Sequence, residues 1–200
     1  MNKIKFLIIA LAGLIACSCG NREIAFPDEC LTFDAPSGKA LKVACVFHAS
    51  LAFEYDGTVI QVDPVTQMGD MRIDYSRFGK AEAIFITHAH PDHLCPQAID
   101  TLSSEKTLLY GNAESVATLG RGCVLANGDA GEVAGGISYA VVPAYNTTAG
   151  REMLHPKGSG NGYIFDFDGF RVYVAGDTET SEEMSGLGTV DLAFLPVNQP

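Results

Sequence analysis

The sequence predicts a layered α/β protein with two β-sheets at its centre. Segments with strand patterns far outnumber helical segments, and the helical segments fall between strands, which is typical of layered folds. Of the 200 residues, 47% are hydrophobic, which suits one domain with a sizeable core. No predicted strand is followed by a GxGxxG pattern, so a dinucleotide-binding fold is not expected.

Strands open the predicted domain. Short runs rich in strand-forming residues flank Asp56-Gly57, a strong two-residue hairpin turn. The expected strands of this part span residues 41–48, 51–55, 58–62 and 83–87. The last of these is continuously apolar, as in a strand buried on both faces. Residues 68–80 are expected to form a loop or a short helix.

The second half of the chain contains the helices and then returns to strands. Helices are expected at residues 96–103 and 113–119, on either side of a buried strand at 107–110. Asp168-Gly169 is a second hairpin turn. Strands are expected at residues 137–142 and 163–168 before this turn, and at residues 170–175 and 191–195 after it.

Residues 1–16 predict a signal peptide. A positive stretch precedes an apolar run at residues 6–16, which is too short for a normal membrane span. The run ends in Leu-Ile-Ala before Cys17, which resembles the bacterial lipobox, so lipid attachment at Cys17 is expected; ordinary signal-peptide cleavage nearby is the alternative. Residues 17–40 are then a lipidated N-terminus and tether, and residues 41–200 the domain. We expect an exported protein of the cell envelope, in contact with the membrane through its lipid anchor only.

The charge of the chain excludes some partners. The formal net charge is −11, and removal of residues 1–16 leaves −13, because two lysines and no acidic residue are lost. So acidic a domain repels phosphate backbones, which argues against nucleic-acid binding. A small-molecule substrate is expected, and the sequence indicates no particular oligomeric state.

Imidazoles and a carboxylate are concentrated directly after the apolar strand at residues 83–87. Residues 87–93 read THAHPDH, which places three of the chain's five histidines within six positions. These side chains are the ligands that zinc and related divalent metals use in proteins. His88 and His90 can share one ion, and Asp92 and His93, past a proline, can face a second. A polar loop with incidental histidines is the alternative, and the density of imidazoles argues against it.

This segment resembles the HxHxDH signature of the metallo-β-lactamase superfamily. FHAS at 47–50 and VDP at 62–64 resemble the opening hairpin of the branch with ascorbate-6-phosphate lactonases and N-acyl-phosphatidylethanolamine phospholipase D-like enzymes. VAGDT at 174–178 and DLAFLP at 191–196 resemble two later strands of that branch. The resemblance covers residues 41–200 and implies a four-layer αββα sandwich that is C-terminally incomplete, because members continue into a helix, a strand and a last ligand histidine.

The resemblance also implies the metal ligands. His88 and His90 would hold the first ion, Asp92 and His93 the second, and Asp177 would bridge them. Asp177 follows an apolar strand, where a carboxylate is unfavourable unless something positive meets it; a helix N-cap at this position is the alternative.

One further ligand of the first ion is expected in the loop after the strand ending near Val142. Members of the superfamily place a histidine near the position where this chain has Asn146, and asparagine is a poor zinc ligand. His155 is the other candidate in this loop and is the predicted ligand. A solvent-exposed loop histidine is the alternative.

The implied chemistry is hydrolysis of an ester, lactone or phosphodiester by two divalent ions, zinc or else manganese or iron. Asp92 and His93 are the predicted catalytic residues as well as ligands. His48 and Asp63 are expected to orient the ligands by hydrogen bonds, and Tyr145 and Asn146 to contact the substrate. The alternatives are a non-catalytic surface lipoprotein that binds a metal or ligand, and an iron-dependent oxidoreductase.

Overall fold

The computed structural model describes residues 23–24 and 30–197. The predicted signal peptide and Cys17 lie outside the described residues. Among the described residues, no helix combines the length and the apolar character needed to cross a membrane.

The first of two large sheets has seven strands in the order β10-β9-β8-β5-β4-β3-β2. Neighbours from β2 to β5 are antiparallel, and β5, β8, β9 and β10 run parallel. The strands are β2 (Cys30–Asp34), β3 (Ala40–Phe47), β4 (Ser50–Tyr55), β5 (Thr58–Val62), β8 (Ala83–Ile86), β9 (Leu108–Gly111) and β10 (Cys123–Val124).

The second large sheet has five strands in sequence order, β11 to β15. They are antiparallel except for the pair β14 and β15. The strands are β11 (Ala130–Val133), β12 (Ile137–Ala144), β13 (Gly160–Phe167), β14 (Phe170–Val174) and β15 (Leu192–Phe194). A small third sheet contains β1 (Glu23–Ile24), β7 (Met71–Ile73) and β6 (Gln67–Met68).

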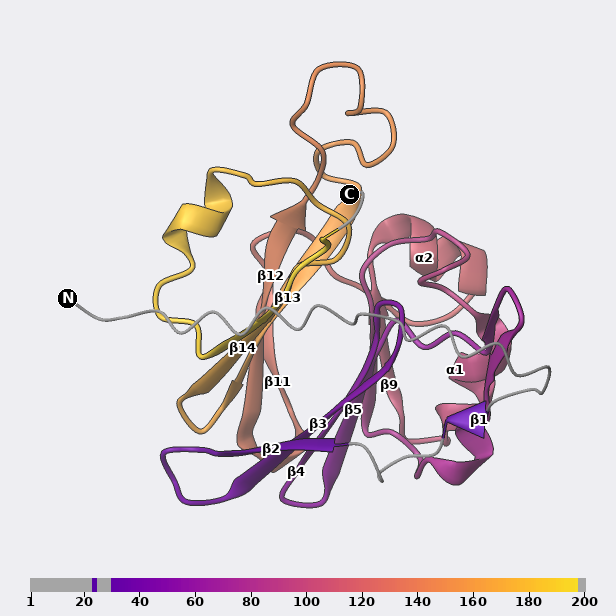
Figure 1. Ribbon diagram of the computed structural model, residues 1–200, viewed down its shortest axis with the longest axis vertical. Coiled ribbons are helices and arrows are strands. Elements are labelled where there is room, and N and C mark those ends of the chain that lie inside the picture. Colours follow the sequence, from indigo (N-terminus) through magenta and orange to yellow (C-terminus); the bar gives the residue numbers. More distant parts are fainter. Residues whose placement is uncertain (1–22, 25–29, 198–200) are drawn as a thin grey trace.

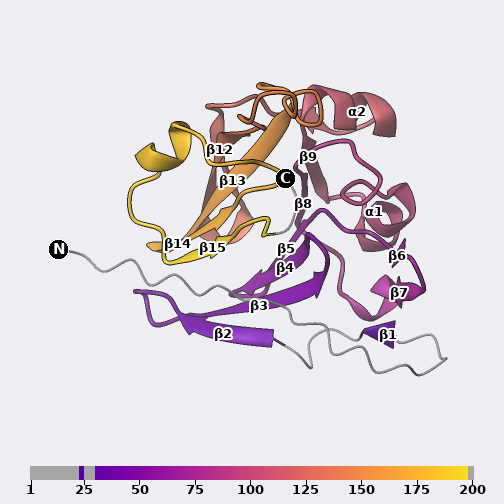
Figure 2. The same ribbon diagram turned by 45° about the horizontal axis from the view of Figure 1, so that its top comes forward.

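Helices lie outside the two sheets (Figure 1, Figure 2). Two α-helices, α1 (Pro96–Leu102) and α2 (Ala113–Leu119), lie beside the first sheet. The 3-10 turns are η1 (Tyr75–Arg77), η2 (Ala134–Gly136) and η3 (Glu183–Gly186), and η3 lies beside the second sheet. Helix α2 begins where the Asn112 side chain accepts from the Ser115 amide at 2.8 Å, and it ends at Gly120, whose φ is 66°. The predicted layered α/β sandwich is confirmed.

Aromatic side chains fill the space between the two large sheets. Phe85 of β8 is fully buried, and its ring centroid lies 4.9 Å from those of Tyr110 and Phe165 and 5.1 Å from those of Tyr139 and Tyr163. These partners come from both sheets, so one cluster joins them. Edge-to-face contacts of this kind add to the free energy of burial.

Two segments differ from the sequence prediction. Residues 68–80, expected as a loop or short helix, contain the short 3-10 helix η1 but also the unexpected strand β7, and Tyr75 and Phe78 pack against helix α1. Residues 30–34, expected as tether, form β2, which pairs with β3 along its whole length. The ring of Phe33 lies 5.3 Å from that of Phe170, so this strand covers the edge of the core and belongs to the domain.

The aromatic cluster gives a prediction for stability. Replacement of Phe85 by alanine is expected to lower the free energy of unfolding by about 3–5 kcal/mol, because the cavity lies where the two sheets meet. Urea denaturation measures this. The control Val124→Ala, at a side chain that is 54% exposed, is expected to change it by less than about 0.5 kcal/mol. Equal stability of the two variants would contradict the assigned role of the cluster.

Candidate metal centre

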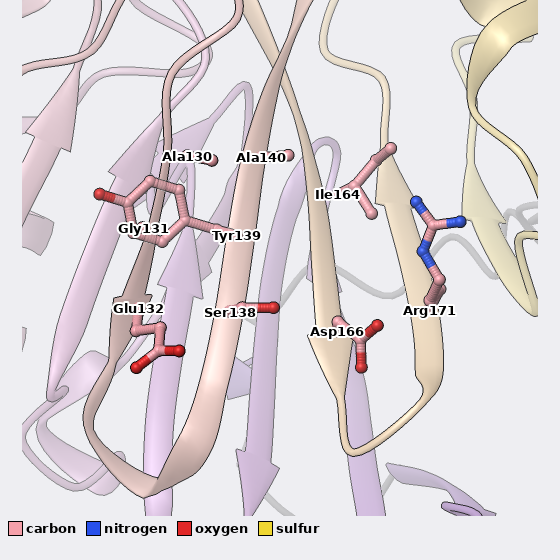
Figure 3. A pocket seen from close by; sticks show the side chains of 9 residues that line it. All are labelled: Ala130, Gly131, Glu132, Ser138, Tyr139, Ala140, Ile164, Asp166 and Arg171. Carbon is pink, nitrogen blue, oxygen red and sulfur yellow. The ribbon is translucent and has the colours of Figure 1, made fainter.

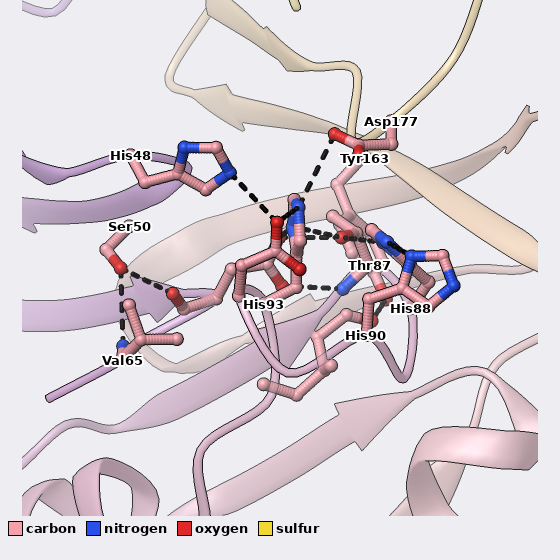
Figure 4. A network of polar contacts seen from close by, with 12 residues as sticks. His48, Ser50, Val65, Thr87, His88, His90, His93, Tyr163 and Asp177 are labelled. Carbon is pink, nitrogen blue, oxygen red and sulfur yellow. Dashed lines mark hydrogen bonds and ion pairs between the residues drawn. The ribbon is translucent and has the colours of Figure 1, made fainter. Parts of the chain in front are cut away.

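The predicted ligands, and the two residues expected to orient them, gather at one end of the two sheets, where several strands end. Asp63 follows β5, the segment from His88 to His93 follows β8, and Asp177 follows β14. His155 lies in the long connection between β12 and β13, and His48 in the turn between β3 and β4. The site is therefore assembled from connections of both sheets. Figure 4 shows five of these side chains close to one another, those of His48, His88, His90, His93 and Asp177.

The first group of possible metal ligands is His88, His90 and His155, whose donor atoms all lie within 4.8 Å of one another. His88 Nε2 is 3.0 Å from His90 Nδ1. The ring of His155 has its centroid 5.1 Å from that of His88 and 5.0 Å from that of His90. His155 is buried, which excludes the exposed-loop alternative for this residue.

The second group contains Asp92 and His93, together with His48, again with donor atoms within 4.8 Å. Asp177 lies between the groups. Its Oδ1 is 3.4 Å from His93 Nε2, and its Oδ2 is 3.4 Å from His155 Nε2. No helix begins after Asp177 in the described part of the chain until η3, so this carboxylate is not a helix N-cap.

The donor set fits divalent metal ions on two observations. The Nε2 atoms of His93 and His155 are buried and make no hydrogen bond within the part of the chain that the structure describes. Donor atoms that share a tetrahedral zinc through bonds of about 2.0–2.1 Å stand about 3.3 Å apart. The separations of 3.0 Å between His88 and His90 and 3.4 Å from Asp177 to either of its histidines agree with this.

Asp63 fixes the orientation of His93. Its Oδ2 accepts hydrogen bonds from His93 Nδ1 at 2.8 Å and from Thr87 Oγ1 at 2.6 Å, and its Oδ1 accepts from the Thr87 amide at 2.7 Å. Asp63 is fully buried. A carboxylate on the far nitrogen of a histidine turns the other nitrogen toward a metal. The contact expected for Asp63 is present.

Thr87 is a positioning residue that the sequence analysis did not identify. Its Oγ1 donates to Asp63 and lies 3.0 Å from His88 Nδ1, from which it can accept. It therefore links the orientation of His88 to that of His93. The available signal was a hydroxyl residue at the end of an otherwise apolar strand.

Asn146 orients His155 in a similar way. Asn146 Oδ1 accepts from His155 Nδ1 at 2.8 Å, and the Asn146 amide donates to the His155 carbonyl at 2.9 Å. Tyr145 donates its hydroxyl to Glu183 at 2.8 Å, and Lys157 lies 4.6 Å above its ring. Both residues are buried, so substrate contact by them stays a prediction, and the structure gives Asn146 an orienting contact instead.

Glu179, which is not among the predicted site residues, connects the loop after β12 to the loop after β14. Glu179 Oε2 accepts from the amides of Thr147 and Thr148 at 2.7 and 2.5 Å. Next to it, Thr178 Oγ1 is 3.0 Å from both the amide and the carbonyl of Tyr145. These contacts join the loop that carries His155 to the segment that carries Asp177. They depend on loops far apart in the sequence, which no local pattern reveals.

The pKa values of His88, His93 and Asp177 in this cluster are shifted in different directions. Burial, together with the nearby charge on His93, lowers the pKa of His88 to about 2. Burial also opposes a charge on His93, but Asp63 and Asp177 outweigh it and raise the pKa of His93 to about 10. The charged His93 in turn holds the pKa of Asp177 below its usual value, although burial acts in the opposite direction. The two carboxylates thus favour the protonated form of His93.

A separate depression of about 460 Å³ lies on the outer face of the second sheet (Figure 3). It shares no residue with the ligand groups. Its charged residues include Asp166 and Arg171, which are engaged in local hydrogen bonds to the Gly169 amide and the Thr189 carbonyl. No group of possible metal ligands in the described residues lies there.

The chain is similar to known proteins over most of its length. A family model described as a β-lactamase superfamily domain matches residues 42–200. A metal-dependent hydrolase of Thermococcus onnurineus is 28% identical over 165 residues, which cover 78% of this chain and 72% of that protein.

Solved structures extend the similarity. The structure of a metal-dependent hydrolase from Parabacteroides distasonis has 47% identity and a TM-score of 0.81, and the match covers 86% of this chain and 76% of that one. Igni18, a metallo hydrolase from Ignicoccus hospitalis, has 27% identity and a TM-score of 0.56, with 74% and 65% covered. The chain belongs to the metallo-β-lactamase superfamily of metal-dependent hydrolases.

Proposed function

We propose that this protein holds two divalent metal ions and hydrolyses an ester, a lactone or a phosphodiester. The observation that carries the proposal is the position of Asp177, whose two oxygens each lie 3.4 Å from a histidine of a different ligand group. A carboxylate in this position can join two ions in one centre. Such a centre is the arrangement that many hydrolases use to cleave ester and phosphate bonds.

In this proposal His88, His90 and His155 hold the first ion, Asp92 and His93 the second, and Asp177 bridges them. When bound, the ions supply Lewis acidity, which lowers the pKa of a bound water and stabilises negative charge on the substrate. Zinc suits the histidine-rich set, and the carboxylates leave manganese and iron as alternatives.

Side chains of the protein orient the ligands and accept a proton. Asp63, Thr87 and Asn146 hold the rings of three ligands, so that their free nitrogens converge before any ion arrives. The Asp92 side chain is 42% exposed and lies at the open side of the cluster. From there its carboxylate can orient a water molecule and accept its proton, which is the catalytic role proposed for it together with His93.

The substrate class is proposed from the sequence resemblance. The FHAS and VDP segments, at residues 47–50 and 62–64, favour the branch with lactonases and phosphodiesterases over the antibiotic-degrading branch. The net charge of −11 supports a small molecule over nucleic acid as substrate. We also propose export and lipid attachment at Cys17, which would place the reaction at the cell envelope.

Metal content and metal removal test the proposal. Elemental mass spectrometry of the purified full chain is expected to find two ions per chain. Chelation is expected to abolish hydrolysis of a p-nitrophenyl ester, a short lactone or bis-p-nitrophenyl phosphate, and zinc is expected to restore it. A chain that binds no metal, or a hydrolytic activity that survives chelation, would contradict the proposed function.

The orienting role of Asp63 gives a second prediction. Asp63→Asn is expected to weaken metal binding by about 10–100-fold, because His93 loses the carboxylate that turns it toward the site. Competition with a chromogenic chelator measures the dissociation constant, and circular dichroism checks the fold.

Asp56→Asn is the matched control for this variant. Asp56 is the same residue type with a similar positive φ, 49° against 46° for Asp63, and it lies in the β4–β5 hairpin turn, away from the ligand groups. It is expected to leave metal affinity unchanged. Equal affinities of the two variants would argue against the role of Asp63.

A further inference from the structure

The turn between β3 and β4 places one imidazole at the edge of the second ligand group. His48 has a φ of 44°, in the left-handed region that residues other than glycine rarely adopt. The pairing of β3 with β4 shifts register between Cys45 and Phe47, immediately before this turn. Bulges and strained residues of this kind concentrate at functional sites, where they direct a side chain.

The imidazole is directed at the cluster, as Figure 4 shows. His48 Nε2 is 3.3 Å from Asp92 Oδ2, and its ring meets that of His93 edge to face with centroids 5.5 Å apart. The donor atoms of the three side chains lie within 4.8 Å of one another. The separation of 3.3 Å equals the spacing of about 3.3 Å between two ligands of one tetrahedral zinc.

An ion pair alone does not account for this arrangement. The side chains of His48 and Asp92 are 36% and 42% exposed, and ion pairs with that exposure contribute little to stability. Such a contact gives no reason for an unfavourable backbone conformation. Nearby, the Nε2 atom of His93 is buried without a hydrogen bond in the described part of the chain. A cation among the three side chains satisfies both observations.

We propose that His48 is a direct ligand of the second metal ion, beside Asp92 and His93. This goes beyond the orienting role expected from the sequence, and it rests on the proposed two-metal function. The second ion then has three side-chain ligands of its own, the number typical of catalytic zinc sites. Asp177 remains the shared carboxylate between the two ions.

The test is the metal binding of His48→Asn in the full chain. Asparagine tolerates a positive φ and lacks the imidazole, so the turn is kept and the ligand is removed. The wild-type chain is expected to bind two zinc ions. The variant is expected to keep the first and to bind the second more than about 100-fold more weakly, which exceeds the 10–100-fold effect of an orienting partner.

Two controls assign the effect to the second site. Asp56→Asn changes another positive-φ turn residue and is expected to leave both affinities unchanged. His90→Asn removes a ligand of the first group and is expected to weaken the first ion while the second is kept. The same pattern is expected in the visible absorption spectra of the cobalt-loaded protein. His48→Asn is expected to alter the bands of the second ion, and the two control variants are expected to leave those bands unchanged.

A measurement on the unaltered chain keeps the test decisive if the variant does not fold. With cobalt in both sites, the ring protons of His48 are expected to show large paramagnetic shifts in NMR spectra. Unshifted His48 protons, or a His48→Asn variant that loses less than about 10-fold in affinity, would overturn the inference while the two-metal function stands. A wild-type chain that binds fewer than two ions overturns the two-metal function, and the inference falls with it.

Discussion

The buried carboxylate of Asp63 is the constraint on which the geometry of the site depends. It has no solvent contact, and its hydrogen bonds go to the backbone and hydroxyl of Thr87 and to the ring of His93. A buried charge is tolerated only when it is paired and fully hydrogen-bonded. The ends of β5 and β8 are therefore held together where the histidine-rich segment begins. Asp63 thereby also fixes the orientation of His93 in this segment.

The rest of the site depends on the packing of the two sheets. His88, His90, Asp92 and His93 follow a strand of the first sheet, whereas His155 and Asp177 belong to loops of the second. The aromatic cluster around Phe85 joins the two sheets, and Phe85 precedes Thr87 by only two residues. Contacts from Glu179 and Thr178 then hold the two loops of the second sheet to each other. The centre is thus a product of tertiary structure, although most of its ligands come from six consecutive residues.

Features with local sequence signals could be predicted, whereas contacts between distant parts of the chain could not. The apolar strand before the motif, the helix at 113–119 and both hairpin turns could be predicted because their signals are local. His155 could be chosen because the loop offers no other histidine, and the structure places it beside His88 and His90. The roles of Thr87, Asn146 and Glu179 could not be predicted, because each acts through a partner that only the folded chain brings near. Strand β2 was assigned to a tether because prolines flank it, and its pairing with β3 is a long-range effect that composition does not show.

The position of Asp177 has a consequence for the stability of the whole domain. An ion held as proposed by this carboxylate and by His93 would be bonded to loops of both sheets at once, so the sheets could not separate while it stayed bound. Any ligand that binds the folded chain and not the unfolded one raises the free energy of unfolding with its concentration. If the chain binds metal as proposed, the lifetime of the folded protein would therefore depend on the supply of free metal around it. Scarcity of that metal would expose the chain to proteolysis, so its abundance in the cell would follow the metal that it uses.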